Sequence, residues 1–463
     1  MRTLAWFIAL AAAAGAQERF AVDWDKLRPD VVERFRELLR IDTSNPPGSE
    51  TRAANAVATM LEREGIATRQ FALDPARANL VARLKGSGAK RPILLLGHTD
   101  VVGVQREKWS VDPFAAVLKD GEIWGRGSRD DKPHVIAGVM TLLLLKRMNV
   151  KLDRDVIFLA EAGEEGTAQY GIDYMIREHW PEIECEYALA EGGAIVAEGG
   201  KPRYLLVSNT EKNPQRIRLV AHGTAGHGSR PTMDNAVVHL AAAVAKAGTW
   251  STPVRLSETT RAYFAGLAPL VAPAAAARYR ALAAGGNLLE IDRYLREREP
   301  AHYSMLRTSV APTIINGGFR SNVIPSEAEA TLDVRALPDE DMAGFVAELR
   351  RVIADPAVEV IPPKANSRPF APPSGIDNEM FRALAAAGRR EFGAPALPYM
   401  MTGATDMAQL RAKGVQAYGT GPMANAEEGA LGGAHSDNER IPVASLMAVL
   451  RWTWDAVTAV AAH

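Results

Sequence analysis

The sequence predicts an α/β protein in which a largely parallel central sheet is interrupted by an inserted α/β domain. In the first half of the chain, short and continuous apolar runs alternate with helical patterns, as they do in sheets covered on both faces. Near residue 212 the runs give way to alternating polar and apolar residues, which indicate strands with one exposed face. A proline-rich stretch at 362–373 then marks a linker, after which the first pattern returns.

These changes divide the 463 residues into a first domain and an insertion. We assign 17–212 and 364–463 to the first domain and 213–363 to the inserted one, which contains a helical insert at about 255–306. In the first part we expect strands at 93–96, 156–160 and 187–190 and helices at 30–39, 55–64 and 135–145. In the insertion we expect strands at 215–221, 330–335 and 358–361 and helices at 236–247 and 341–354. In the last part we expect a strand at 415–418 and helices at 378–392, 407–413 and 443–460.

Residues 1–16 have the pattern of a secretory signal peptide. Arg2 supplies a positive charge, 4–14 is almost purely apolar, and Ala14-Gly15-Ala16 is a small-x-small cleavage pattern. The alternative is an uncleaved anchor, but the apolar stretch is short beside the ~20 residues of a spanning helix. We therefore expect a periplasmic or secreted protein that is not membrane-bound after cleavage.

The charge balance and the cysteine count exclude several kinds of binding site. Lys and Arg number 54 against 55 Asp and Glu, and this balance predicts no attraction to nucleic acid. A single cysteine, Cys185, excludes an intrachain disulfide framework and a cysteine-based zinc cluster. A metal site would have to use His, Asp and Glu.

Acidic and histidine residues follow each of the three apolar strands of the first part. His98 and Asp100 follow the first strand, Glu164 and Glu165 the second, and Glu191 the third. Because sites in open α/β sheets lie beyond the carboxyl ends of the strands, we expect these side chains to share one cluster.

Two loops add to this cluster, one with the paired acids Asp130 and Asp131 and one with His435. Carboxylates in one site repel unless a cation neutralises them. Histidine with carboxylate suits catalytic zinc, with cobalt or manganese as substitutes, and the number of candidate ligands favours two ions ~3.5–4 Å apart. Taken singly, each residue has a plainer interpretation as a buried histidine, a solvated charge pair or a helix cap.

With these motifs in order, the sequence resembles the M20 metallopeptidases, which include glutamate carboxypeptidase, aminoacylase, succinyl-diaminopimelate desuccinylase and carboxypeptidase S. The resemblance covers nearly the whole mature chain. It implies a zinc-binding catalytic domain with an inserted lid that dimerises. The helical insert and the run 109–114 are most similar to the carboxypeptidase S and N-acyl-amino-acid hydrolase branch.

The resemblance also implies a ligand set. His98 and Glu191 would hold one zinc, Glu165 and His435 the other, and Asp130 would bridge the two. The family often has a cis peptide after this aspartate, so we expect one at Asp130–Asp131.

Catalytic and substrate-binding roles follow from the same resemblance. Asp100 would hydrogen-bond His98 and fix its tautomer, Glu164 would be the general base, and His227 of the lid would reach the active site of the partner subunit. The residues implied to contact substrate are Asn322, Arg335, Thr405 and Arg368, with Arg335 pairing a carboxylate of the substrate. The chain departs from the family pattern at Gly163, where an aspartate is usual, and at Pro133 and His134, where many members have glycine.

We therefore expect an exported, homodimeric, dinuclear zinc hydrolase that cleaves the amide bond of dipeptides, peptide C-termini or N-acyl amino acids. One alternative is an ester or lactam hydrolase that uses the same metals. Another is a non-catalytic binding domain that retains the fold, although such relatives tend to lose ligands that this chain keeps.

Overall fold

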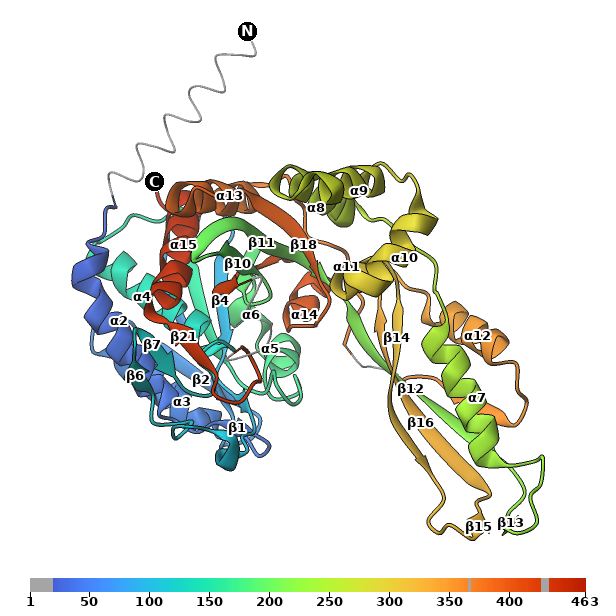
Figure 1. The fold of residues 1–463 in the computed structure, drawn as a ribbon. Helices are drawn as coiled ribbons and strands as arrows, with labels where there is room; N and C mark the ends of the chain where they lie inside the picture. The colour runs from blue at the N-terminus through green and yellow to red at the C-terminus, as the bar shows by residue number, and fades with distance from the viewer. Residues whose placement is uncertain (1–19, 365–367, 426–432) are drawn as a thin grey trace. The chain divides into compact units, whose positions relative to one another are not determined.

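The structure is a computed structural model that describes residues 20–364, 368–425 and 433–463, and it contains two units (Figure 1). The first unit ends at Asn209 and resumes over Ser374–Tyr399 and Thr405–His463. The second comprises Thr210–Pro373 and Met400–Ala404, so it extends past the end expected at 363. The predicted signal peptide lies outside the described residues.

The first unit is built on a ten-stranded sheet. Its strands, in spatial order, are β2 (Thr68–Ala72), β3 (Ala78–Leu84), β8 (Val156–Glu161), β4 (Ile93–His98), β9 (Tyr187–Ala190), β19 (Gln416–Gly419), β11 (Lys201–Glu211), β10 (Ala194–Glu198) and β20 (Met423–Asn425), and β18 (Ala396–Met401) also pairs with β11. Smaller sheets join β1 (Ser44–Asn45) to β5 (Val101–Val102), and β21 (Arg440–Pro442) to β7 (Glu122–Trp124) and β6 (Val117–Lys119).

The sheet is mixed, and its central strands are parallel as predicted. The four strands β8, β4, β9 and β19 are parallel, and they include all three predicted apolar runs. Beside them, β2–β3, β3–β8, β11–β19 and β10–β11 are antiparallel. The turn at Gly199 and Gly200 that joins β10 to β11 is too short for the crossover that parallel pairing requires, which is why these two strands are antiparallel.

Helices cover both faces of the parallel strands (Figure 1). Around one apolar cluster lie α2 (Trp24–Leu39), α3 (Glu50–Glu62), α4 (Lys132–Arg147), α13 (Glu379–Phe392) and α15 (Val443–Ala461). Around the other lie α5 (Ile172–Glu178), α6 (Trp180–Ile183) and α14 (Met407–Ala412). A separate 3-10 turn, η1, spans Arg106–Lys108. Ile93 and Leu95 belong to the first cluster, whereas Leu94 and Leu96 belong to the second. Since each such side chain contributes ~1.5–3 kcal/mol when fully buried, burial on both faces explains the continuous apolar runs.

A glycine brings β4 and α4 together where the functional residues lie. A Cβ atom added to Gly97 would be 2.7 Å from the backbone nitrogen of Val135. The strand and the start of the helix therefore approach more closely than another residue would allow. This contact places the loop before α4, which carries Asp130, beside His98 at the end of β4.

The second unit contains an antiparallel sheet with the strand order β14 (Ser309–Gly317), β16 (Glu327–Ala336), β12 (Asn213–His222) and β17 (Val358–Ile361). Helices α7 (Ala236–Thr249) and α12 (Met342–Ile353) share its apolar cluster. The predicted helical insert consists of α8 (Glu258–Leu267), the 3-10 turn η2 (Ala268–Leu270), α9 (Pro273–Ala283), α10 (Leu288–Arg298) and α11 (Pro300–Met305), and the ribbon β13 (Gly226–His227) with β15 (Val323–Ile324) completes the unit.

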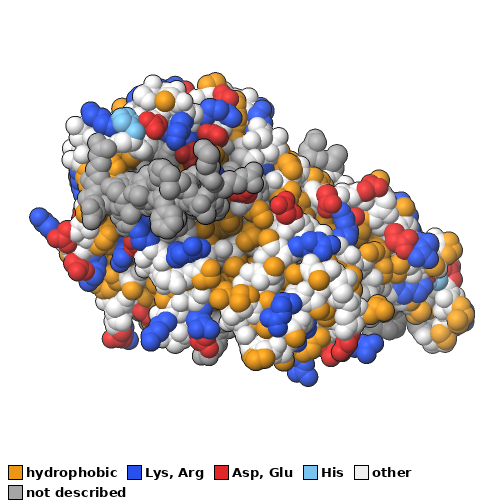
Figure 2. Space-filling view, turned by 90° about the horizontal axis from the view of Figure 1, so that it is seen from above, with side chains coloured by type: hydrophobic (Ala, Val, Ile, Leu, Met, Phe, Trp, Pro, Cys, Tyr) orange, Lys and Arg blue, Asp and Glu red, His pale blue; other side chains and the backbone are white. Residues whose placement is uncertain are grey.

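The visible surface carries charges of both signs interspersed with apolar side chains (Figure 2). This mixture agrees with the net charge of −1. Across the described ranges, every helix is too short or too polar to cross a membrane.

Candidate metal centre

The structure brings the five residues predicted as metal ligands into two overlapping groups, with the ligand atoms of each group within 4.8 Å of one another. His98, Asp130 and Glu191 form the first group. The His98 Nε2 atom lies 3.0 Å from Asp130 Oδ1 and 3.9 Å from Glu191 Oε1. His98 ends β4 and Glu191 follows β9, so the adjacent parallel strands deliver both side chains to one edge of the sheet.

The second group contains Asp130 again, with Glu165 and His435. His435 Nε2 lies 2.9 Å from Glu165 Oε1 and 3.3 Å from Asp130 Oδ2. Asp130 thus turns one carboxylate oxygen toward each histidine. The Asp130–Asp131 peptide bond is cis, which confirms the prediction for that bond.

This donor set fits divalent cations. A tetrahedral zinc ion with bonds of about 2.0–2.2 Å holds its ligand atoms roughly 3.3 Å apart, and the four distances within the two groups span 2.9–3.9 Å. Imidazole and carboxylate ligands suit zinc, cobalt and manganese. The geometry supports two cation positions that share Asp130.

The electrostatics of the cluster favour exchange of protons for cations. Hydrogen bonds to Asp130 and Glu165 raise the pKa of His435 to about 10. Burial, followed by repulsion from Asp130 and Asp131, raises the pKa of Glu191 well above its usual value. Protons therefore occupy the cluster near neutral pH when no cation is bound, and cation binding must release them.

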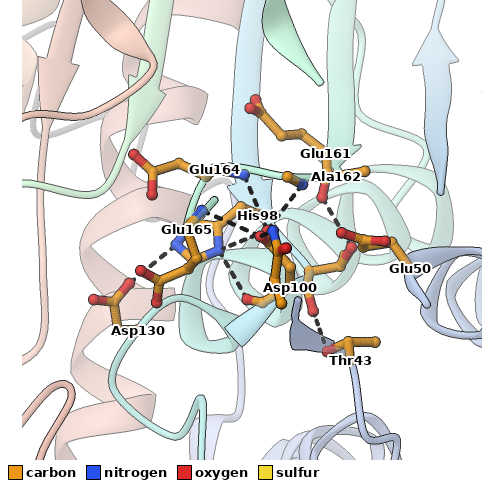
Figure 3. A network of polar contacts seen from close by, with 12 residues as sticks. Thr43, Glu50, His98, Asp100, Asp130, Glu161, Ala162, Glu164 and Glu165 are labelled. Atoms are coloured by element: carbon orange, nitrogen blue, oxygen red, sulfur yellow. Dashed lines mark hydrogen bonds and ion pairs between the residues drawn. The ribbon is translucent and has the colours of Figure 1, made fainter. Parts of the chain in front are cut away.

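Asp100 organises the turn that carries Glu164 and Glu165 (Figure 3). Its fully buried carboxylate accepts hydrogen bonds from the backbone N–H groups of Gly163, Glu164 and Glu165 at 3.0, 3.1 and 3.1 Å. The side-chain amide of Asn45 donates a fourth at 2.8 Å. Burial raises the pKa of Asp100, but the hydrogen bond and charge of His98, followed by the hydrogen bonds from Asn45 and the Glu165 N–H, hold that pKa below its ordinary value.

The main-chain carbonyl of Asp100 is the nearer partner of the His98 ring. The His98 Nδ1 atom lies 3.0 Å from that carbonyl oxygen and 3.4 Å from carboxylate Oδ1. Both partners are acceptors, so Nδ1 carries a proton. Nε2 lies 3.0 Å from Asp130 Oδ1, and a cation in the first group would take its lone pair in place of that hydrogen bond. The carbonyl thus shares the orienting role that the sequence assigned to the carboxylate.

The departure from the family pattern at Gly163 has a structural reason. Gly163 has φ +83°, and a Cβ atom there would lie 2.7 Å from the carbonyl oxygen of Thr167. Glycine permits this tight turn. Glu164, half-buried on the turn, belongs to neither metal group, although it is adjacent to Glu165.

Glu161 ends β8 but does not join either metal group in the described residues. Its carboxyl group is fully buried. Burial and the neighbouring Asp406 carboxyl raise the pKa of Glu161 well above its usual value. Glu161 therefore belongs to the interior of the first unit rather than to the candidate centre.

In the second unit, His227 lies on β13 of the β13–β15 ribbon, and Asn322 directly precedes β15. His227 pairs with Val323, and the Gly228 N–H donates to the Asn322 carbonyl at 2.8 Å. The His227 ring is exposed, and the Ser229 N–H donates to its Nδ1 atom at 3.2 Å. A neutral ring that accepts at Nδ1 carries its proton on Nε2.

The other predicted substrate residues have partners within their own units. Arg335 is half-buried, and its Nε atom lies 3.0 Å from Asp333 Oδ1. Arg368 Nη1 lies 3.4 Å from Glu211 Oε1. Thr405, in the first unit, is 1% exposed, and its hydroxyl accepts the Met407 N–H at the start of α14.

Sequence reasoning missed three polar residues around the centre, namely Asn45, Arg126 and Glu439. Asn45 binds Asp100, and Arg126 forms a buried ion pair with Glu439 at 2.7 Å. Arg126 and Glu439 lie in the two loops that the sequence analysis singles out for Asp130 and for His435. Their pairing across more than 300 positions leaves no local pattern.

Comparisons with known proteins agree with this geometry. The model of peptidase family M20/M25/M40 matches residues 94–457. A probable carboxypeptidase S-like 2 from Dictyostelium discoideum is 32% identical over 328 residues, which cover 68% of this chain and 62% of the relative. The human N-fatty-acyl-amino acid synthase/hydrolase PM20D1 is 29% identical over 276 residues, covering 58% of this chain and 54% of the relative. The matches therefore span less than two thirds of these two relatives.

Among solved structures, the M20 family metallo-carboxypeptidase Sso-CP2 from Sulfolobus solfataricus superposes with a TM-score of 0.70 at 17% identity. The superposition covers 92% of this chain and 98% of that protein. At this identity the likeness establishes the fold.

Replacing Asp100 with asparagine tests its role in the metal centre. Whichever oxygen becomes an amide would face two donors, so the turn that carries Glu165 would shift. We expect Asp100→Asn to weaken zinc affinity ~10–100-fold, measured by titration of the chelator-treated protein. Asp74→Asn is the control, because Asp74 also accepts a backbone N–H but lies on an exposed turn. Unchanged zinc affinity in Asp100→Asn would contradict the assignment.

Proposed function

This chain belongs to peptidase family M20/M25/M40, and from that premise we propose that it is a dinuclear zinc hydrolase. Its reaction is the cleavage of an amide bond in dipeptides, peptide C-termini or N-acyl amino acids. The observation that carries the proposal is the placement of Asp130, whose two oxygens each face a histidine of a different three-residue group.

Bound in these two groups, the cations would supply Lewis-acid activation of water and of the scissile carbonyl. Glu164 is the proposed general base. It lies on the same turn as the ligand Glu165, anchored by Asp100, but it does not belong to a metal group. It takes the proton from the attacking water and delivers it to the leaving amine.

His227 is the proposed oxyanion donor. The Ser229 N–H and hydroxyl both lie at the His227 Nδ1 atom, at 3.2 and 2.7 Å. These contacts support a ring whose Nε2–H is ready to donate to an oxygen that gains negative charge in the transition state. We propose that this donor acts in the active site of a partner subunit.

The substrate class follows from chemistry that the two named relatives share. A peptide C-terminus and an N-acyl amino acid both present a free carboxylate next to the scissile amide. Arg335 and Asn322 are the proposed recognition residues. Because Arg335 pairs with Asp333 at 3.0 Å, a substrate carboxylate must compete with an existing partner.

The exposed edge of the second sheet supports a homodimer. Strand β14 is an outer strand of its sheet, and Ile314 and Ile315 on it are 54% and 59% exposed. Phe319 beyond the strand and Val238 on α7 are 79% and 60% exposed. A sheet edge bordered by apolar side chains favours association, and the proposed partner is a second copy of this chain.

We also propose export to the periplasm or the cell exterior. The support is the signal-peptide pattern of residues 1–16.

A substrate panel with and without chelator tests the proposed activity. We expect zinc-dependent hydrolysis of dipeptides or N-acyl amino acids with a free carboxylate, and little hydrolysis of the matching carboxamides. Chelation should abolish turnover, and added zinc should restore it. Hydrolysis of esters or lactams alone would replace the proposal with the alternative metal hydrolase, whereas no hydrolysis at all would favour a binding protein.

Glu164→Gln tests the general base. Glutamine cannot accept the proton, so we expect turnover to fall by at least ~10²-fold while zinc content stays at the wild-type level. Glu178→Gln, at the exposed end of α5, is the control. Near-normal turnover in Glu164→Gln would falsify the assignment.

Ile315→Lys tests the dimer. A lysine in the apolar edge should shift the protein to monomers in sedimentation, and activity should fall with it because His227 would lose its partner site. Leu289→Lys is the matched control, since Leu289 is 88% exposed on α10 of the same unit. A wild-type protein that is monomeric and active would remove the proposed role of the partner subunit.

A further inference from the structure

Glu439 holds the loop that leads to Asp130. The Glu439 side chain is almost completely buried, four positions after His435. Its Oε2 atom accepts hydrogen bonds from Arg126 Nη1 at 2.7 Å and from the Gly127 N–H at 3.2 Å. Its Oε1 atom accepts the Arg129 N–H at 2.7 Å. One carboxylate thus fixes the backbone immediately before the shared ligand Asp130.

Arg126 holds the opposite loop in return. Its guanidinium is 3% exposed, and Nη1 also donates to the carbonyl of Ser436 at 3.1 Å. Ser436 directly follows His435. The guanidinium carbon lies 5.3 Å from the centre of the Trp109 ring, which limits its freedom to move. The pair therefore connects the backbone beside Asp130 to the backbone beside His435.

The His435 loop needs such a restraint. His435 and Asn438 have φ angles of 62° and 60°, in the left-handed region that residues with a Cβ atom rarely adopt. Asn438 tolerates this conformation, and its Oδ1 atom accepts the N–H and the hydroxyl of Ser110, each at 2.8 Å. The side-chain contacts described for His435 are to Asp130 and Glu165, on other segments. The loop geometry that aims its ring at Asp130 therefore depends on contacts from outside the loop.

Net stability is a weak explanation for this pair. Removing two charges from water costs free energy that their attraction often only offsets, and apolar replacements are frequently as stable. Arg126 Nη1 donates to both Glu439 and Ser436, and the two Glu439 oxygens accept from different backbone N–H groups, so the pair instead gives a fixed geometry between two loops.

We propose that Arg126 and Glu439 are positioning residues that create the second cation position by locking the Asp130 loop to the His435 loop. The inference rests on the proposed two-metal site and deepens it. It assigns formation of the Asp130–Glu165–His435 group to a contact outside the ligands. The group His98–Asp130–Glu191 depends less on the pair, because β4 and β9 hold two of its members.

Glu439→Gln and cobalt titration of the chelator-treated protein test this proposal. The introduced side-chain amide would turn an N–H₂ group toward backbone donors and remove the negative charge that faces Arg126. We expect the first cobalt ion to bind with nearly wild-type affinity and the second to bind ~10–100-fold more weakly, as followed by its absorption spectrum. At a free zinc concentration that just fills both positions of the wild type, the zinc bound per chain should fall from two in the wild type toward one in the variant.

The matched control is Asp155→Asn. Asp155 lies 2.9 Å from Arg83 Nη1 and accepts the Gly86 N–H at 2.9 Å, so it also joins an arginine to a backbone donor, but its described contacts lie outside both ligand loops. This variant should bind two ions like the wild type. Thermal melting of the metal-free proteins checks folding. If Glu439→Gln does not fold, Arg126→Lys keeps the charge but loses the Nη1 atom that reaches both Glu439 and Ser436, and it should show the same selective loss.

The outcomes separate the two proposals. If the wild type and Glu439→Gln (or Arg126→Lys) bind the second ion equally well, the positioning role is overturned and the two-metal site stands. If both ions weaken equally, the selectivity for the second position is also overturned. A wild type that binds only one ion overturns the two-metal site and this inference together.

Discussion

The site depends on one carboxylate placed between two imidazoles. Asp130 lies 3.0 Å from His98 and 3.3 Å from His435, with a different oxygen toward each ring. Glu191 completes the group around His98, and Glu165 completes the group around His435. Three carboxylates this close repel one another, so the cluster is stable only with protons or cations between them. The raised pKa values of Glu191 and His435 express the same constraint in the absence of cations.

Buried carboxylates outside the ligand groups hold the ligands in place. Asp100 fixes the turn of Glu164 and Glu165 through three backbone N–H groups, and Glu439 fixes the loop before Asp130 in the same way. An oxygen that accepts backbone donors defines the position of a loop more sharply than apolar packing does. The precision of the centre therefore comes from acids that do not bind metal, which is why such residues determine metal affinity in many sites.

Much of the fold was accessible from sequence because it follows local patterns. Continuous apolar runs at 93–96, 156–160 and 187–190 became β4, β8 and β9, buried on both faces. The change to alternating residues became the antiparallel sheet of the second unit. The antiparallel pair β10–β11 beside the parallel centre has no such local signal, because its pairing direction depends on the length of a connection rather than on the residues within the strands.

The sequence by itself determined the chemical character of the site. It supplied histidines and acids at the ends of predicted parallel strands, no cysteine ligand, and a spare glutamate at position 164. Only the tertiary structure decided which acids line the two candidate cation positions. In the folded structure Glu161 is buried, the Asp100 carboxylate accepts backbone N–H groups, and Arg126 pairs with Glu439. The physical reason is that burial and hydrogen-bond partners are set by segments distant in the sequence, 55 to 65 positions away for Asp100 and 313 for Arg126. These partners decide whether a carboxylate is charged and where it points.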